Sequence, residues 1–195
     1  MTGNILIDTL PDRLTVGGAP CAIYTDYRHY ILLELLLADR EASPAEKAEG
    51  ALQLVYVRPP APFEEAVDRL LWFYQCGRPV VPAAGVGTGN PARQRRIYDF
   101  EVDAPLIYAA FLTQYGLDLT EVSLHWWKFC ALFQALEEGH EISKIMNYRA
   151  ADLSKIQDKE RRRFYARMQA QYRLPDPRCE SEKAAAAGAI FGGMR

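Results

Sequence analysis

Residue types that build metal and redox sites are scarce in this sequence. It has three histidines and four cysteines among 195 residues. The cysteines are roughly fifty residues apart, so none has a neighbour at metal-ligand or redox spacing. They are Cys21, Cys76, Cys130 and Cys179. His29 and His140 are equally isolated, so we expect no metal site, no cofactor, and free thiols in a reducing cytoplasm.

Long apolar runs and a large net charge are also missing. The longest apolar stretch, Ile31 to Ala38, is interrupted by Glu34, and the first residues lack a basic segment followed by an apolar one. We therefore expect neither export nor a membrane-spanning segment. The net charge of −2 gives no overall attraction to nucleic acid or to an anionic membrane. The chain does have 49% hydrophobic residues, which is enough to build a core without metal sites or disulfide bonds.

The first part of the chain has the pattern of a hairpin followed by a helix. Leu14 to Val16 and Cys21 to Tyr24 are β-prone runs on either side of Gly17-Gly18-Ala19-Pro20. Two glycines permit the positive φ of a tight reversal, so we predict a small hairpin within residues 1–25. Asp26 is then expected to cap a helix whose leucines lie on nearly every side.

Two more helices are predicted before a break in the pattern. Ser43-Pro44-Ala45-Glu46 is a capping box with proline at the first helical position. Pro62 opens the next helix, which ends near Gly77. Its expected apolar stripe is Phe63, Val67, Leu70 and Tyr74.

Two segments lack a periodic apolar pattern. Residues 78–97 are dense in proline and glycine and predict a long loop, and residues 174–195 predict an extended or disordered tail. The chain between them is expected to belong to one helical domain over residues 26–173. The predicted fold is mainly α, with the hairpin packed on this domain.

The second half is expected to hold the centre of the core. Its first helix ends at Gly116, and Thr120 is expected to cap the next, which runs to Leu136. The apolar stripe of that helix is Val122, Trp126, Phe129, Phe133 and Leu136, widened by Leu124, Trp127 and Ala131. Because this stripe covers more than half of the helix, we place the core here. Further helices are predicted over Ile142–Tyr148 and Leu153–Arg173.

Few groups of residues have a pattern that indicates chemistry. Asp99, Glu101 and Asp103 could hold a divalent cation for a hydrolase, but they also precede a helix N-terminus, where the macrodipole favours carboxylates. We prefer this structural interpretation. The segment GVGTGN at 85–90 lacks the strand and helix of a nucleotide site and is interpreted as a linker.

His125 and Cys130 lie about one turn apart, but a catalytic pair also needs a third group that orients the base. We interpret the histidine as a core or interface residue. Two basic clusters, at 93–96 and 159–163, favour an alternative function as a nucleic-acid-binding phage protein. Acidic residues lie close to the second cluster, so the simpler interpretation is that the cluster belongs to a solvated face of a helix.

One stretch carries a family resemblance. The strings YDF, YAAFLTQYGLDL and LHWWKF, followed by KIMNYRAADLS and a basic helix, resemble the bacteriophage "gene product fifteen" family. The similarity covers roughly Tyr98 to Tyr172. It implies a gene between those of the major tail protein and the tape-measure protein of a phage or prophage with a long, non-contractile tail.

The resemblance implies a non-catalytic tail assembly chaperone in the cytoplasm of the bacterial host. Its expected partners are the tape-measure protein, which it keeps soluble, and the major tail tube protein, with self-association as a further possibility. A helical binder suits this role, because a tape-measure chain exposes long apolar stripes before the tube surrounds it. The residues expected to meet a partner are Leu33, Leu36, Leu37, Trp126, Trp127, Phe164, Met168 and Tyr172.

Overall fold

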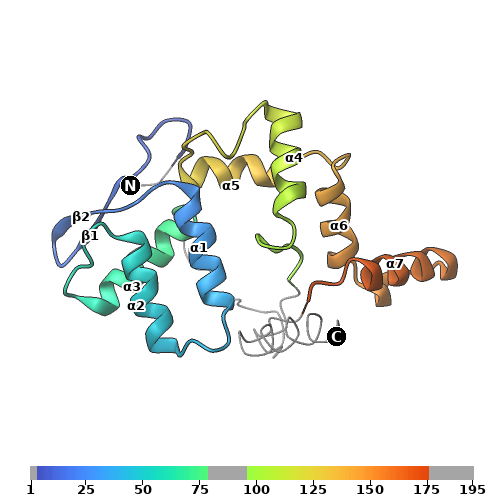
Figure 1. Ribbon diagram of the computed structural model, residues 1–195, viewed down its shortest axis with the longest axis horizontal. Coiled ribbons are helices and arrows are strands. Elements are labelled where there is room, and N and C mark those ends of the chain that lie inside the picture. The colour runs from blue at the N-terminus through green and yellow to red at the C-terminus, as the bar shows by residue number, and fades with distance from the viewer. Residues whose placement is uncertain (1–3, 79–95, 176–195) are drawn as a thin grey trace, which may run out of the picture. The chain divides into compact units, whose positions relative to one another are not determined.

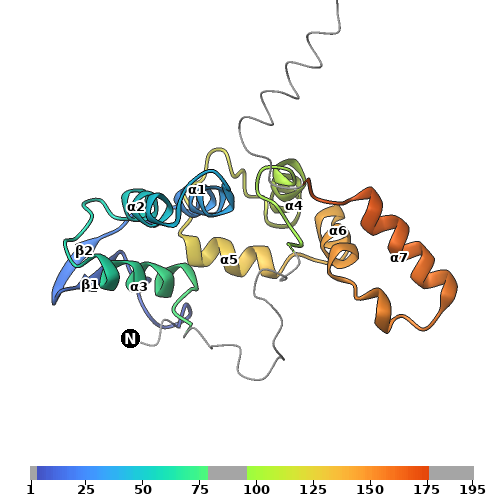
Figure 2. The ribbon, with the colours of Figure 1, turned by 90° about the horizontal axis from the view of Figure 1, so that it is seen from below.

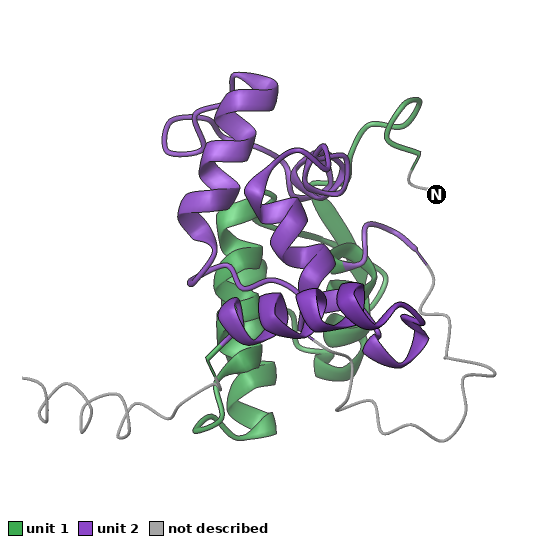
Figure 3. Ribbon diagram, turned by 90° about the vertical axis from the view of Figure 1, so that its right-hand side faces the viewer, with its two compact units in different colours: residues 1–74, 175–195 green, residues 75–174 purple. Residues whose placement is uncertain are grey.

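The computed structural model describes residues 4–78 and 96–175. It confirms a mainly helical protein with a small two-stranded hairpin near the N-terminus (Figure 1). The chain divides into two compact units, residues 1–74 with 175–195 and residues 75–174 (Figure 3). The helical domain expected over 26–173 runs across this division.

Some predicted features lie outside the described residues. They are most of the 78–97 loop with its GVGTGN segment, the first three residues of the 93–96 basic cluster, Cys179, and the tail beyond Pro175. No helix in the described part of the chain is long and apolar enough to cross a membrane.

The hairpin in unit 1 has the predicted turn. Strands β1 (Arg13–Val16) and β2 (Ala19–Ala22) pair antiparallel, with Val16 opposite Ala19. Gly17 and Gly18 have φ of 57° and 76°, and positive φ at both turn residues defines a type I′ turn. Strand β2 starts two residues earlier than expected and includes Pro20, which a two-stranded sheet tolerates because both strands are edges.

Helices α1 (Tyr27–Ala38) and α2 (Pro44–Val55) start at their predicted caps. The Asp26 carboxylate accepts the Arg28 N–H, and the Ser43–Glu46 capping box is complete. The two helices pack side by side (Figures 1 and 2). Their close approach uses Gly50, since a Cβ there would lie 2.9 Å from Leu36 Cδ2.

Helix α3 (Phe63–Tyr74) forms where predicted, but its predicted stripe is only partly right, with Leu70 buried and Phe63 exposed. Ala66, Leu70 and Phe73 are buried, whereas Phe63 is 47% exposed. Contacts with other parts of unit 1 determine which side of α3 faces the core. The Tyr56 hydroxyl donates to the Ala66 carbonyl at 2.9 Å, and the Gly17 N–H of the hairpin turn donates to the Glu65 carboxylate at 2.9 Å.

Unit 2 contains the remaining helices. Helix α4 (Ala104–Tyr115) ends at Gly116 with φ 65°, as predicted, and α6 spans Glu141–Ala150. The prediction of a single helix over Leu153–Arg173 is wrong. A 3₁₀ turn, η2 (Leu153–Lys155), precedes α7 (Lys159–Gln171), because Asp152 and Asp158 each cap a separate start by accepting the Ser154 and Arg161 N–H groups.

The central helix α5 (Trp126–Gln134) is shorter than predicted. Thr120 does not cap it, because the Asp118 carboxylate accepts the Thr120 N–H and hydroxyl at 2.8 and 2.6 Å and closes a local turn. Val122 and Leu124 therefore lie before the helix. The cap is His125, whose Nδ1 accepts the Trp127 N–H at 3.1 Å.

The aromatic side chains of α5 are central to the core of unit 2, as predicted. Trp126, Trp127 and Phe129 are each at most 3% exposed. The Phe129 ring stacks on Phe111 of α4, with centroids 5.1 Å apart. Tyr98 and Phe100, from the segment before α4, pack against Phe133 at 5.2 and 6.0 Å. This cluster holds the chain that leads into α4 against α5.

Candidate functional site

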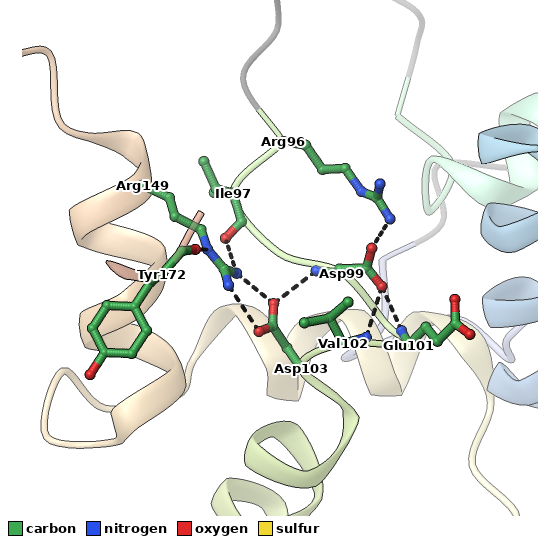
Figure 4. A network of polar contacts seen from close by, with 8 residues as sticks. All are labelled: Arg96, Ile97, Asp99, Glu101, Val102, Asp103, Arg149 and Tyr172. Carbon is green, nitrogen blue, oxygen red and sulfur yellow. Dashed lines mark hydrogen bonds and ion pairs between the residues drawn. The ribbon is translucent and has the colours of Figure 1, made fainter. Parts of the chain in front are cut away.

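A buried polar network lies where α4 begins, within unit 2 (Figure 4). Arg149, from the last turn of α6, is 7% exposed, and Asp103, which precedes α4, is 2% exposed. The guanidinium holds the carboxylate with both terminal nitrogens, Nη1 to Oδ2 at 2.5 Å and Nη2 to Oδ1 at 3.1 Å. This two-pronged pairing fixes orientation as well as charge.

Arg149 also joins two further segments. Its Nε donates to the Tyr172 carbonyl at the end of α7 at 2.7 Å, and Nη1 donates to the Ile97 carbonyl at 3.1 Å. One side chain therefore connects α6, the start of α4, the segment before it and the end of α7. These hydrogen bonds hold the backbone of the connected segments in position.

Asp99 extends the network toward solvent. Its carboxylate accepts the Glu101 and Val102 N–H groups at 2.7 and 3.0 Å and pairs with the Arg96 guanidinium. Its own N–H donates to Asp103 at 3.0 Å. Among the described residues, every buried side-chain nitrogen or oxygen has a hydrogen-bond partner. The network is thus saturated by the protein itself.

The acidic residues Asp99, Glu101 and Asp103, which could have held a cation, have a different role in this structure. Both Asp103 oxygens are occupied by Arg149, and Figure 4 shows the Glu101 side chain directed away from the Asp103 carboxylate. Within residues 4–78 and 96–175, no group of three or more His, Cys, Asp or Glu side chains could hold a metal ion. Asp103 occupies the predicted place at a helix N-terminus, but its side chain makes no cap hydrogen bond. The role of Arg149 was not predicted, because it lies 46 positions from Asp103 and carries no local signal in the sequence.

The histidines and cysteines form other contacts than a catalytic pair. His125 uses its ring nitrogen to cap α5, and the His29 ring contacts the Leu54 carbonyl at 3.0 Å. The Cys130 thiol hydrogen-bonds to Cys76. This bond, helped by the nearby Arg78 guanidinium, lowers the pKa of Cys76 despite burial.

The residues predicted to meet a partner differ in how much of their surface is accessible. Leu33, Trp126 and Trp127 are at most 3% exposed, so they belong to the core and offer no surface. Leu36 is half-buried against Gly50. Those with accessible surface are Leu37 at 44%, Phe164 at 39%, and the partly exposed Met168 and Tyr172.

Other exposed apolar side chains were not in the predicted set. Leu32 on α1 is 50% exposed, and Phe63 and Leu71 on α3 are 47% and 38% exposed. The helical pattern of α3 could have identified Leu71, which falls outside the predicted stripe. The pattern of α1 could not identify Leu32 as exposed, because this helix has leucines on nearly every side.

Comparisons with known proteins give one match. No curated protein and no solved structure matches the chain. A family model described as "Bacteriophage Gp15 protein" matches residues 6–174, which include all of unit 2 and residues 6–74 of unit 1. This match reaches well beyond the segment from Tyr98 to Tyr172 that carries the resemblance in sequence. The chain is therefore a member of the bacteriophage Gp15 protein family.

Proposed function

We propose that this phage protein is a non-catalytic tail assembly chaperone that acts in the host cytoplasm. It binds the tape-measure protein, keeps it soluble and assists assembly of the tail tube. Family membership over residues 6–174 is the observation that carries the proposal. The mainly helical fold supports it, because helical surfaces readily cover the apolar stripe of another helix.

Exposed apolar side chains of unit 1 are the proposed contact surface. On α1 these are Leu32 and Leu37, and on α3 they are Phe63 and Leu71. Large apolar side chains that remain in water favour association, and full burial of an exposed one gains roughly 1.5–3 kcal/mol. These four are already about half-buried, so each has about half of that left to gain. Several such contacts are enough for a transient complex that later releases the tape-measure protein.

The test is co-expression with the tape-measure protein of the same phage. We expect the tape-measure protein to stay soluble and to copurify with the wild-type chain. The variant Leu32→Glu/Leu37→Glu should lose copurification, because it replaces both exposed leucines of α1 with charged side chains. Leu112→Glu is the matched control, since Leu112 is 43% exposed but lies on α4 in unit 2. Equal solubility of the tape-measure protein with and without this chain would overturn the proposal.

A further inference from the structure

Helix α7 has two faces of different chemistry. Its inner face packs on α6 through a cluster of rings, with Phe164 and Tyr165 each 5.8 Å from the Tyr148 ring. Gln169 adds hydrogen bonds to the Tyr148 and Ala151 carbonyls at 2.8 and 2.7 Å. These contacts fix which side of α7 faces α6 (Figure 2).

The outer face carries a basic stripe, which we define as Lys159, Arg162, Arg163 and Arg167. At 3.6 residues per turn these four side chains fall within an arc of about 140° and span about 12 Å along the helix. All four are exposed, as are Ala166 and Ala170 on the same face of the helix. In the described part of the chain, no ion pair joins any of the four to an acid.

Charge is strongly segregated along the chain. Residues 155–173 contain seven basic and two acidic side chains, whereas residues 4–78 and 96–154 together contain twenty acidic and eleven basic ones. The net charge of −2 conceals this division. A basic helix and an acid-rich body are thus present on the same chain and at equal concentration.

We propose that the basic stripe docks on exposed acidic side chains of a second copy of this chain. The acid-rich surface is defined as the exposed acids of residues 4–78 and 96–154 in that copy. The contact is head to tail, so each copy offers one basic stripe and one acid-rich surface. Heterologous contacts of this kind extend into rings or open chains. Separated opposite charges favour such docking and speed the encounter of the copies.

The observations favour a second copy over nucleic acid. The aromatic rings that could stack on bases are already engaged within the chain. Phe164 and Tyr165 pack against Tyr148 of α6, and the Arg167 guanidinium of the basic stripe lies 5.8 Å from the centroid of the Phe164 ring. The acid-rich remainder of the described chain also repels a polyanion. Phosphate contacts alone would leave that acidic surface uncompensated.

The first test measures mass against salt for the full chain after nuclease treatment. We expect light scattering to give a weight-average mass at least twice the monomer value of 22.1 kDa at low salt. It should approach the monomer value near 0.5 M NaCl, because the Debye length falls from about 10 Å at 0.1 M to about 3 Å at 1 M. A monomer at low salt, or assembly that is lost on nuclease treatment, would overturn the proposal.

The second test uses Arg163→Glu/Arg167→Glu, which reverses half of the basic stripe. This variant alone should be monomeric at low salt. Its matched control is Arg58→Glu/Arg69→Glu, which reverses two exposed cations of unit 1 and should still assemble. Thermal unfolding followed by circular dichroism should show that both variants fold.

Mixing separates head-to-tail docking from other arrangements. The tagged Arg163→Glu/Arg167→Glu variant keeps its acid-rich surface, so it should still capture untagged wild-type chain at low salt and release it at high salt. Failure to capture wild-type chain would refute a head-to-tail contact. Assembly of the variant alone, to the same mass as wild type, would show that the basic stripe is not the contact.

Discussion

Arg149 connects four segments of unit 2 through its hydrogen bonds, so Arg149→Met tests how far this network stabilises the unit. Methionine retains most of the aliphatic volume but none of the five guanidinium N–H donors. The Asp103 carboxylate, 2% exposed, would lose both of its guanidinium contacts and keep the Asp99 N–H. The Ile97 and Tyr172 carbonyls would also lose a donor.

The expected magnitude follows from the burial of the pair. Breaking a buried ion pair by removing one partner destabilises by about 3–5 kcal/mol, because an uncompensated charge stays buried. Arg149→Met/Asp103→Asn removes both charges. We therefore expect the double variant to be at least as stable as Arg149→Met alone.

Lys144→Met is the matched control on the same helix. Lys144 pairs with Glu141 at 3.8 Å, but the two side chains are 47% and 51% exposed, so the change should cost about 0–1 kcal/mol. The free energy of unfolding is measured by urea titration, followed by circular dichroism and tryptophan fluorescence. If Arg149→Met and Lys144→Met lose the same free energy, the network does not hold unit 2 together.

Three further changes test individual contacts. Gly50→Leu should lower the free energy of unfolding by about 1–3 kcal/mol in urea titration, because its side chain would collide with Leu36, and adding Leu36→Ala should restore part of the loss. Ser43→Ala should cost about 1 kcal/mol in the same assay, since it removes the side-chain half of the capping box. Cys130→Ala should raise the pKa of Cys76, whose thiolate the Cys130 thiol stabilises, so alkylation of Cys76 by iodoacetamide, followed by mass spectrometry, should need a higher pH. An unchanged pH dependence of that alkylation would contradict the assigned thiol contact.

Local signals in the sequence predicted the elements that local chemistry fixes. The Gly17-Gly18 turn, the Ser43 capping box and the Gly116 C-cap each depend on a few adjacent residues, and all three occur as predicted. The predicted start of α5 was wrong for a related reason. Thr120 is a good cap residue, but Asp118 captures its N–H and hydroxyl first, and the sequence does not show which of two competing local hydrogen bonds wins.

Features set by long-range contacts could not be predicted. The rotation of α3 depends on Gly17 of the hairpin, which contacts Glu65 across 48 positions. Arg149 reaches Asp103 across 46 positions. Periodicity showed that α5 is apolar, but it did not separate side chains that fill the core, such as Trp126, from side chains that remain accessible. Accessibility is a property of the whole packed unit.

The Arg149 network and the basic stripe on α7 are physically connected, which gives a last prediction. No side chain of α7 is buried, so the direction of its outer face depends on a few contacts. They are the ring cluster around Tyr148, the Gln169 hydrogen bonds and the bond from Arg149 to the Tyr172 carbonyl. Arg149→Met removes that bond without changing any charge of the basic stripe. We therefore expect Arg149→Met to lower self-association at low salt, measured by light scattering, together with stability, and to increase hydrogen exchange of α7 amides. Arg163→Glu/Arg167→Glu should abolish self-association with exchange unchanged. Its stability should fall by no more than about 1 kcal/mol, for the lost contact of Arg167 with the Phe164 ring. If Arg149→Met loses stability but assembles like wild type, docking does not need a fixed α7, and charge alone drives the contact.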